Sequence, residues 1–279
     1  MLIELVFANI DSEWSLEIIR GVDRVAKQSG LSIVLTESGD HRSPAPDWID
    51  GVLRRRPVGV ILLFSDLSAD HKRQLRTRNI PFVVVDPAGD PAPDVASVGS
   101  ANWSGGLTAT RHLIALGHRR IAMITGPDDM MCSRARLSGF RAAHEEAGLP
   151  FDRSLVIEGH FHYDDGLEAA DRFLSMDDRP TAIFAGNDIQ AFGVYEAARN
   201  HGLNIPRDLS VVGYDDIPPA RWVGPALTTV QQPLIEMAEQ AARLVLALRD
   251  DPDRSAVRLE LATSLIERGS TAAAPSESD

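Results

Sequence analysis

Polar side chains follow the short apolar runs of this sequence, and their types suit hydrogen bonding to a small neutral molecule. Carboxylates and amides bond polyol hydroxyls in pairs, and an aromatic ring such as Phe161 can cover the apolar face of a sugar. Each group also has a second interpretation, because Asn, Asp and Gly end strands and cap helices without touching a ligand. The groups are Asn9, Asp11, Ser65-Asp66, Asp86, Asp128, His160-Phe161, Asn187-Asp188 and Asp215-Asp216.

The elements that must position these groups alternate between strands and helices. Apolar runs predict strands over 2–7, 31–36, 58–64, 82–85, 120–125, 155–158, 181–185 and 209–213. Helical spacing of apolar residues predicts helices over 14–29, 69–78, 103–116, 132–147, 166–176, 189–201 and 234–248. This alternation is typical of α/β folds with parallel sheets covered by helices. In such sheets ligands bind beyond the carboxyl ends of the strands, where the polar groups stand.

One interruption of the rhythm predicts how the chain is divided. Residues 86–99 hold three prolines and no helical pattern, which indicates a crossing between two domains. The segment 227–230 is a short extended piece, and a final strand is expected over 258–265. The simplest layout is one doubly wound half, a second half, and a return of the chain to the first.

Composition excludes several classes of protein. The 279 residues carry 28 Lys and Arg against 40 Asp and Glu, a net charge of −12, so this chain alone is not expected to grip a phosphate backbone. The single cysteine, Cys132, forbids an intrachain disulfide and fits a reducing compartment. The N-terminal residues resemble no signal peptide, and no apolar run could cross a membrane. A cytoplasmic protein is the default expectation.

Motifs for catalysis and metal binding are absent from the sequence. It contains no G-x-G-x-x-G, Walker A, G-x-S-x-G or H-E-x-x-H pattern, so neither an enzyme nor a cofactor is expected. His160 and His162 could ligate a metal but lack a third ligand, so we expect no metal. Gly105-Gly106 is interpreted as a close helix packing contact rather than a phosphate site.

Several stretches taken together resemble the effector-binding domain of LacI/GalR-type bacterial transcription regulators, over residues 1–268. They are the run Leu116–Gly126 (LGHRRIAMITG), Arg134-x-Arg136-Leu137-x-Gly139-Phe140, Pro180–Asp188 (PTAIFAGND), Gly202–Asp216 with its ending Val211-Val212-Gly213-Tyr214-Asp215-Asp216, and Pro225-x-Leu227-Thr228-Thr229-Val230-x-Gln232-Pro233.

The resemblance implies a fold of the type 1 periplasmic-binding-protein kind, with two subdomains joined by three crossings. The expected ranges are 1–100 plus 233–255 for the N-terminal subdomain, 101–232 plus 256–268 for the C-terminal subdomain, and a disordered tail at 269–279. It also implies a small effector, typically a sugar, held in the cleft between the subdomains. The matching positions are Arg136 as the ligand-gripping arginine, Asn187 and Asp215 as polar contacts, Phe161 as a stacking aromatic, Gln232 at the last crossing, and Trp14 and Asp86 as further candidates.

The resemblance implies a homodimer as well, with Phe192, Tyr195, Trp222 and Val223 in its interface. Family members usually begin with a DNA-reading helix-turn-helix headpiece, and the chain opens without one, so operator DNA is expected as a partner only through such a headpiece. The aspartate common before Asn102 is replaced by Ala101. A sugar receptor of a transport system is the alternative function, and an enzyme built on the carboxylates is the weakest hypothesis.

Overall fold

The chain folds into two compact units, each built around one sheet. The computed structural model describes residues 1–10, 12–39, 48–63, 67–87 and 89–275. Unit 1 comprises Met1–Ser100 and Pro233–Leu261, and unit 2 comprises Ala101–Gln232 and Ala262–Asp279. The chain therefore passes between the units three times. No helix of the described ranges is long and apolar enough to span a lipid bilayer.

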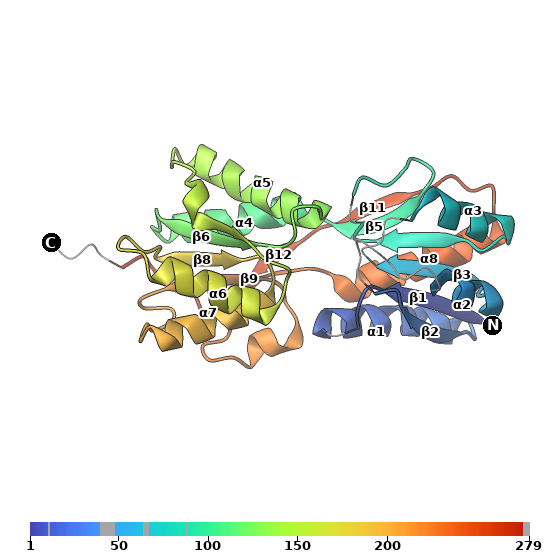
Figure 1. Ribbon diagram of the computed structural model, residues 1–279, viewed down its shortest axis with the longest axis horizontal. Helices are drawn as coiled ribbons and strands as arrows, with labels where there is room; N and C mark the ends of the chain where they lie inside the picture. Colours follow the sequence, from blue (N-terminus) through green and yellow to red (C-terminus); the bar gives the residue numbers. More distant parts are fainter. Residues whose placement is uncertain (11, 40–47, 64–66, 88, 276–279) are drawn as a thin grey trace. The chain divides into compact units, whose positions relative to one another are not determined.

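Within the described residues, unit 1 contains a six-stranded parallel sheet of order β11-β5-β4-β3-β1-β2 (Figure 1). Its strands are β1 (Leu2–Phe7), β2 (Ser32–Glu37), β3 (Gly59–Leu63), β4 (Phe82–Val85), β5 (Ala96–Ser100) and β11 (Arg258–Leu261). Its helices are α1 (Glu13–Gln28), α2 (Trp48–Arg55), α3 (Ala69–Thr77) and α8 (Leu234–Asp250).

The central strands of unit 1 are buried on both faces, as their apolar composition predicts. Every residue of β3 and β4 is buried. On one face, α2 and α3 pack Val52 and Leu75 against Val60, Leu62 and the strands beside them. Helices α1 and α8 pack against each other, and α8 also contacts β3, β4 and β5. The sheet is thus enclosed by helices, which the doubly wound prediction requires.

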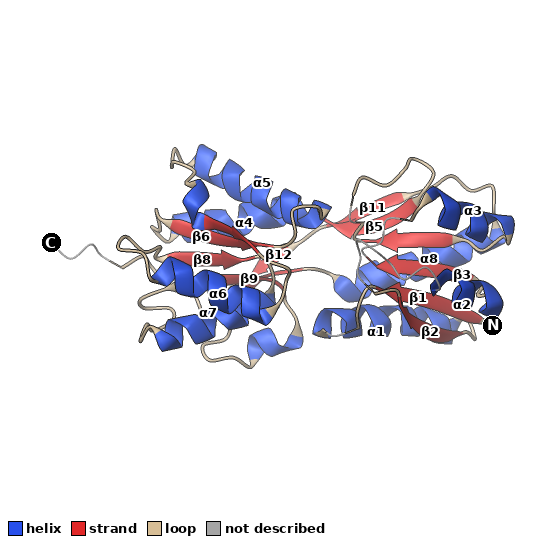
Figure 2. Ribbon diagram, viewed as in Figure 1, coloured by secondary structure: helices blue, strands red, loops and turns tan. Residues whose placement is uncertain are grey.

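Unit 2 repeats the architecture with a second six-stranded sheet in the part of the chain described, of order β12-β10-β9-β8-β6-β7 (Figure 2). Its strands are β6 (Ile121–Thr125), β7 (Val156–Glu158), β8 (Ala182–Ala185), β9 (Ser210–Asp215), β10 (Thr228–Gln231) and β12 (Ser264–Ile266). Only β12 runs antiparallel, to β10. The helices are α4 (Asn102–Ala115), α5 (Met131–Glu146), α6 (Tyr163–Leu174) and α7 (Asp188–Asn200), with short 3₁₀ turns η1 (Arg153–Leu155) and η2 (Pro218–Arg221).

Alternate residues of the unit 2 strands build two separate cores. Met123 and Phe184 pack with residues of α4 and α5 on one face. Ile124 and Ile183 pack with residues of α6 and α7 on the other. Because successive side chains of a strand point to opposite faces, both faces must be apolar when helices cover both.

Helices α4 and α5 approach very closely at Gly106 and Gly139. A Cβ on Gly106 would overlap the backbone of Arg136, and a Cβ on Gly139 would overlap the backbone of Trp103. Gly105 packs against the ring of Tyr214 in β9, whereas the interpretation as a close helix packing contact is confirmed for Gly106. This contact brings the start of α5, where Arg136 lies, against the start of α4.

Three predictions about the course of the chain are wrong. The segment 86–99 is not the crossing, because Ala96–Ser100 is strand β5 and pairs with β4 inside unit 1. The expected final strand at 258–265 is two strands, since Arg258–Leu261 pairs with β5 and Ser264–Ile266 pairs with β10. The expected change of subdomain after residue 255 therefore falls after Leu261, where the pairing partner changes.

The segment 269–275, expected to belong to a disordered tail, packs against unit 2. Ser270 is fully buried; its hydroxyl donates to the carbonyl of Val211 and accepts from the amide of Thr228. Small polar residues suggested disorder, yet these same residues satisfy the backbone of neighbouring strands. Residues 276–279 of that tail lie outside the described residues.

Helix α2 is not among the helices predicted from the sequence, and it spans only 8 residues.

Candidate functional site

Arg136 is the centre of a polar cluster in unit 2. Its guanidinium is almost fully buried, with Nε donating to Asn102 Oδ1 over 2.8 Å and Nη1 donating to the carbonyl of Gly186 over 2.6 Å. Its Nη2 lies 4.0 Å from Asp215 Oδ1, and its Cζ lies 3.7 Å from the ring centroid of Tyr214. A planar cation lying on an aromatic face and donating at its edge is fixed in orientation. The orientation of the Arg136 guanidinium is therefore set by groups of the protein itself.

Asp215 and Gln232 meet at the ends of two neighbouring strands. The parallel pairing of β9 and β10 places Asp215 beside Gln231, so Gln232 follows at the same sheet edge. The side-chain Nε2 of Gln232 donates to Asp215 Oδ1 over 2.6 Å, and the backbone amide of Gln232 donates to the backbone carbonyl of Asp215 over 3.3 Å. The carboxylate thus stands between an amide and the guanidinium of Arg136, and its oxygens are of the type that accepts hydrogen bonds from hydroxyl groups.

Asn187 joins this edge through a helix cap. As N-cap of α7, its Oδ1 accepts from the amide of Gln190 over 2.8 Å. Its Nδ2 donates to the carbonyl of Phe161 over 3.1 Å. Phe161 has a φ of +68°, which is unusual for a bulky residue, and its ring packs on Gly126, where a Cβ would overlap it. Asn187 thus caps α7 through Oδ1 and holds the Phe161 loop through Nδ2.

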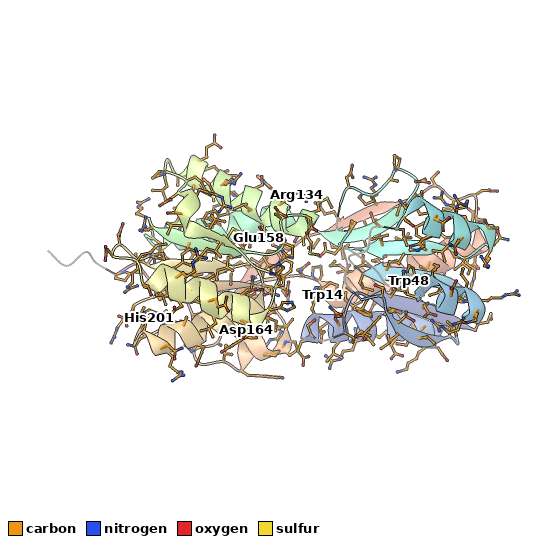
Figure 3. The ribbon with its side chains drawn as sticks, in the orientation of Figure 1. Trp14, Trp48, Arg134, Glu158, Asp164 and His201 are labelled. Atoms are coloured by element: carbon orange, nitrogen blue, oxygen red, sulfur yellow. The ribbon has the colours of Figure 1, made fainter. Side chains whose placement is uncertain are left out.

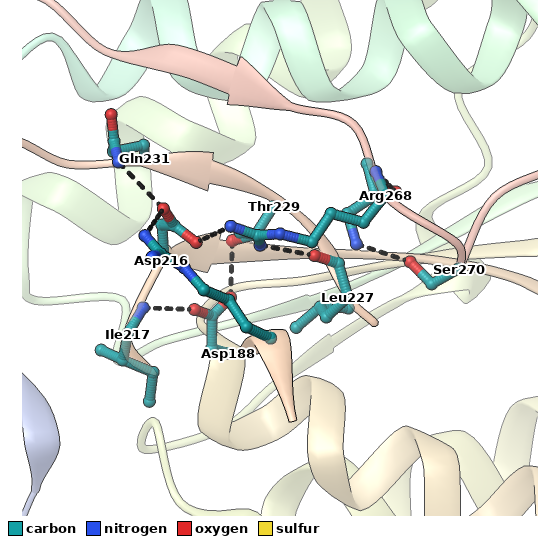
Figure 4. Close-up of polar contacts among 10 residues, drawn as sticks. Asp188, Asp216, Ile217, Leu227, Thr229, Gln231, Arg268 and Ser270 are labelled. Carbon is teal, nitrogen blue, oxygen red and sulfur yellow. Dashed lines mark hydrogen bonds and ion pairs between the residues drawn. The ribbon is translucent and has the colours of Figure 1, made fainter. Parts of the chain in front are cut away.

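Asp188 next to it is fully buried and turned into the unit. Its two carboxyl oxygens accept from the hydroxyl of Thr229 over 2.5 Å and from the amide of Ile217 over 2.9 Å (Figure 4). Burial, with the neighbouring charge of Asp215 as a second cause, raises the pKa of Asp188 well above its usual value. This carboxyl joins β10 to the chain that leaves β9, so its role is structural.

Two candidates, Trp14 and Asp86, lie in unit 1. Trp14 stands in the first turn of α1, after Ser12 caps the helix (Figure 3), and its side chain is 9% exposed. Asp86 follows β4 with a φ of +50°, and its amide donates to the carbonyl of Val98. Both follow the carboxyl end of a strand of the same sheet. Of the other unit 1 positions singled out in the sequence, Asn9 is exposed between β1 and α1, and Asp11 and Ser65-Asp66 lie outside the described residues.

The four expected interface residues differ in exposure. Trp222 is 74% exposed at the end of η2. Phe192, Tyr195 and Val223 are half-buried against the core between α6, α7 and the sheet. The hydroxyl of Tyr195 donates to the carbonyl of Pro225 over 2.8 Å. Of these four residues, Trp222 alone presents most of its side chain to solvent.

The backbone at His160 and His162 is bonded to the start of helix α6. The amides of His160 and His162 both donate to the carboxylate of Asp165, in the first turn of α6. Among the residues that the structure describes, no group of three or more His, Cys, Asp or Glu could hold a metal ion.

Asn102 and Tyr214 belong to the cluster, yet sequence reasoning assigned neither to it. Tyr214 is fully buried within β9 and therefore reads as a core residue. Asn102 follows the first crossing directly, and that position was its only signal. Asn102 accepts a hydrogen bond from Arg136, and the Tyr214 ring lies under the guanidinium. Both residues belong to elements that are distant from Arg136 in the sequence, so no local pattern connects them to it.

Comparison with known proteins places this geometry in context. Residues 110–271 match the family model described as a periplasmic binding protein-like domain. The chain is 33% identical over 253 residues to the HTH-type transcriptional repressor PurR of Vibrio atlanticus, covering 90% of this chain and 75% of that protein. It is 36% identical over 255 residues to the ribose operon repressor of Escherichia coli, covering 91% of this chain and 77% of that repressor.

A solved structure shows the same fold over nearly its whole length. The chain superposes with a TM-score of 0.89 and 26% identity on a LacI family transcriptional regulator from Enterococcus faecium with bound ribose, covering 98% of this chain and 99% of that one. The two-sheet α/β architecture predicted from the sequence is thereby confirmed.

Proposed function

Since the chain belongs to the LacI family of bacterial transcription regulators, we propose that its effector is a neutral sugar bound by the polar cluster of unit 2. The chain is the effector-sensing domain of such a regulator. The observation that carries the sugar proposal is the buried Arg136 beside Asp215 and Gln232. Asn187 and Phe161 complete the set, and Trp14 and Asp86 contact the same effector from unit 1.

The charge balance of the cluster supports a neutral ligand. The positive charge of Arg136 is matched by the carboxylate of Asp215, 4.0 Å away, so no uncompensated cation awaits a phosphate. Phe161, whose ring centroid lies 5.8 Å from Arg136 Cζ, offers an apolar face to ring C–H groups. The relatedness to a ribose operon repressor and to a ribose-bound regulator points the same way.

In this proposal the domain works as a homodimer that changes the affinity of attached headpieces for operator DNA. Effector binding shifts an equilibrium between two arrangements because it binds one of them better. Trp222, with its 74% exposure, is the anchor of the dimer surface, and Phe192, Tyr195 and Val223 surround it. The repressor relatives favour this function over transport, and we propose that the protein acts in the cytoplasm without catalysing a reaction.

A thermal-shift screen tests the sugar. D-ribose, other mono- and oligosaccharides, nucleosides and phosphorylated sugars are added to the wild type and to the Arg136→Ala, Asp215→Ala and Arg134→Ala variants. A ligand at about a hundred times its Kd stabilises by about 2.7 kcal/mol, which gives a clear shift. We expect a neutral sugar to stabilise the wild type and Arg134→Ala, whose exposed residue lies on the same helix, and neither of the other two. Stabilisation only by a phosphorylated sugar or nucleoside contradicts the proposal.

Analytical ultracentrifugation tests the dimer separately. We expect a dimer at micromolar concentration and a monomer for Trp222→Ser. A wild type that sediments as a monomer contradicts the assigned surface.

A further inference from the structure

The turn that presents Asp215 is conformationally strained. Asp215 has a φ of +114° and Asp216 a φ of +58°, so two successive residues with a Cβ adopt backbone geometry that favours glycine. Such conformations cost free energy and persist only where surrounding groups hold them. The position of the Asp215 carboxylate therefore depends on whatever fixes this turn.

Asp216 is the part of the turn with the most partners. Its side chain is 1% exposed, and Oδ1 accepts from Arg268 Nη2 over 2.5 Å. Oδ2 accepts from Gln231 Nε2 over 2.9 Å and from Arg221 Nη2 over 3.4 Å (Figure 4). Of the two arginines that pair with Asp216, Arg268 is the more buried: its side chain is 14% exposed, against 62% for Arg221.

Arg268 is the second residue of a segment that is bonded along unit 2, residues 267–274, here called the C-terminal strap. Its own amide donates to Thr228 Oγ1, and Nη1 donates to the Leu227 carbonyl over 2.8 Å. Beyond Ser270, the amide of Ala272 donates to the Ser210 hydroxyl and the amide of Ala274 to the Leu116 carbonyl. The strap is thus a fixed point from which the guanidinium reaches Asp216.

The strap also continues one of the passages of chain between the units. Strand β11 of unit 1 ends at Leu261, and β12 of unit 2 begins at Ser264, with only two residues between them. The other two passages arrive at the same cluster: Asn102 follows the first and bonds Arg136, and Gln232 precedes the second and bonds Asp215. Each of the three passages therefore lies next to a residue that bonds Arg136, Asp215 or Asp216.

We propose that Arg268 is a positioning residue for effector binding, which holds the strained turn through Asp216 and so places the Asp215 carboxylate. The inference rests on the proposed function, because Asp215 must contact the effector. It gives the C-terminal strap an indirect part in binding, through the contact of Arg268 with Asp216.

Hydrogen exchange tests the proposal without any effector. The amide of Ile217 is protected by its bond to Asp188, and it directly follows the turn. We expect Arg268→Met to speed exchange in peptides covering 214–217 by about tenfold, while peptides of α6 and α7 exchange as in the wild type. Arg111→Met is the matched control, because Arg111 makes two 2.7 Å bonds to Glu146 on the exposed surface of α4 and α5.

Calorimetry with D-ribose then measures the consequence for binding. We expect Arg268→Met to raise the dissociation constant by about tenfold, with Arg111→Met within twofold of the wild type. Arg268→Lys should give an intermediate value, since an ammonium can reach Asp216 but cannot serve the Leu227 carbonyl at the same time. The double variant Arg268→Met/Asp216→Asn should bind no worse than Arg268→Met alone.

The outcomes separate the two proposals. Unchanged exchange at 214–217 in Arg268→Met overturns the positioning role, whatever binds. Faster exchange throughout unit 2 overturns it as well, because that marks a general loss of stability. Faster exchange confined to the turn, with D-ribose binding equal to the wild type, refutes a role in binding. Failure of D-ribose to bind the wild type counts against the proposed effector and leaves the exchange result to decide the role of Arg268 in the turn.

Discussion

Two turns of unit 2 follow neighbouring parallel strands and carry the same kinds of polar residue, yet they are held in different ways. The turn after β8, residues 186–188, leads into a regular helix, and Asn187 caps that helix through Gln190, three residues on. The turn after β9, residues 215–217, has two left-handed aspartates and leads only into the short η2. The two nearest side-chain partners of the Asp216 carboxylate are Gln231 and Arg268, which lie 15 and 52 residues further along the chain.

The comparison shows that polar side chains at a sheet edge can be fixed either by a local helix cap or by contacts with residues distant in the sequence. The first turn is organised by its own sequence, because an N-cap satisfies amides that any helix leaves open. The second is organised by the strands and the strap around it, and its geometry would relax without them. Asp188 connects the two turns, because it belongs to the first and bonds the amide of Ile217 in the second.

Removing that connection should have the largest effect. Asp188→Ala leaves the Thr229 hydroxyl and the Ile217 amide buried without their acceptor, and we expect a loss of about 3 kcal/mol in the free energy of unfolding. Urea denaturation measures it. Asp171→Ala is the control, because that carboxylate is 61% exposed and pairs with His201 on the surface. Equal losses for both variants would mean that Asp188 does not link the turns.

A pH series sharpens the comparison through charge. The pKa of Asp188 in the folded protein lies well above its ordinary value of 3.8, chiefly through burial. The folded state therefore holds the proton more tightly, so the stabilisation by Asp188 is full below about pH 3.8 and declines as the pH rises through the folded pKa. The unfolding free energy of the wild type minus that of Asp188→Asn should fall by at most about 1.4 kcal/mol per pH unit.

The charge of Asp215 should displace this decline. Because Asp215 is the second cause of the raised pKa of Asp188 in the folded protein, Asp215→Asn should lower that pKa, so the decline should end at a lower pH and be smaller in total. A flat difference between wild type and Asp188→Asn across the acid range would show that the carboxyl of Asp188 does not titrate differently in the two states.

The sequence predicted the parts of this site that depend on local signals. The strands β1 and β4 have the predicted bounds, and the polar residues after β8 and β9 stand at one sheet edge, because parallel strands place their carboxyl ends together. Asn187 is a cap, as one of its two interpretations required.

The remaining parts depend on contacts between distant segments. Ser270 and Arg268 read as the approach to a polar tail, because small and charged residues carry no periodicity that reveals a docking surface. Their importance comes from the open backbone and carboxylate groups of β9 and β10 that they satisfy. Likewise Ala96–Ser100 lacks the continuous apolar run of a central strand, and only pairing with β4 and β11 makes it β5.

Asn187 allows the two functions of the first turn to be separated. Asn187→Ala removes the cap and should lower the free energy of unfolding by about 1 kcal/mol. Asn187→Ser restores a capping oxygen but not the Nδ2 amide that donates to the Phe161 carbonyl, so stability should return while D-ribose still binds more weakly. Urea denaturation and calorimetry on the same preparations decide this. If the serine variant binds the sugar like the wild type, the bond to Phe161 has no part in recognition.

The smallest effect should come from Arg221, the exposed partner of the second turn. Its ion pair with Asp216 spans 3.4 Å with the guanidinium 62% exposed, so water competes for both groups. We expect Arg221→Ala to change the free energy of unfolding by no more than about 0.5 kcal/mol. The difference should vanish near 1 M NaCl, where the screening length is about 3 Å. The faster exchange of peptides covering 214–217 in Arg268→Met should persist in that salt, because the ion pair of a guanidinium that is 14% exposed is poorly screened. If salt abolishes both effects alike, Asp216 is held by surface charge, and the second turn is no more dependent on buried distant contacts than the first.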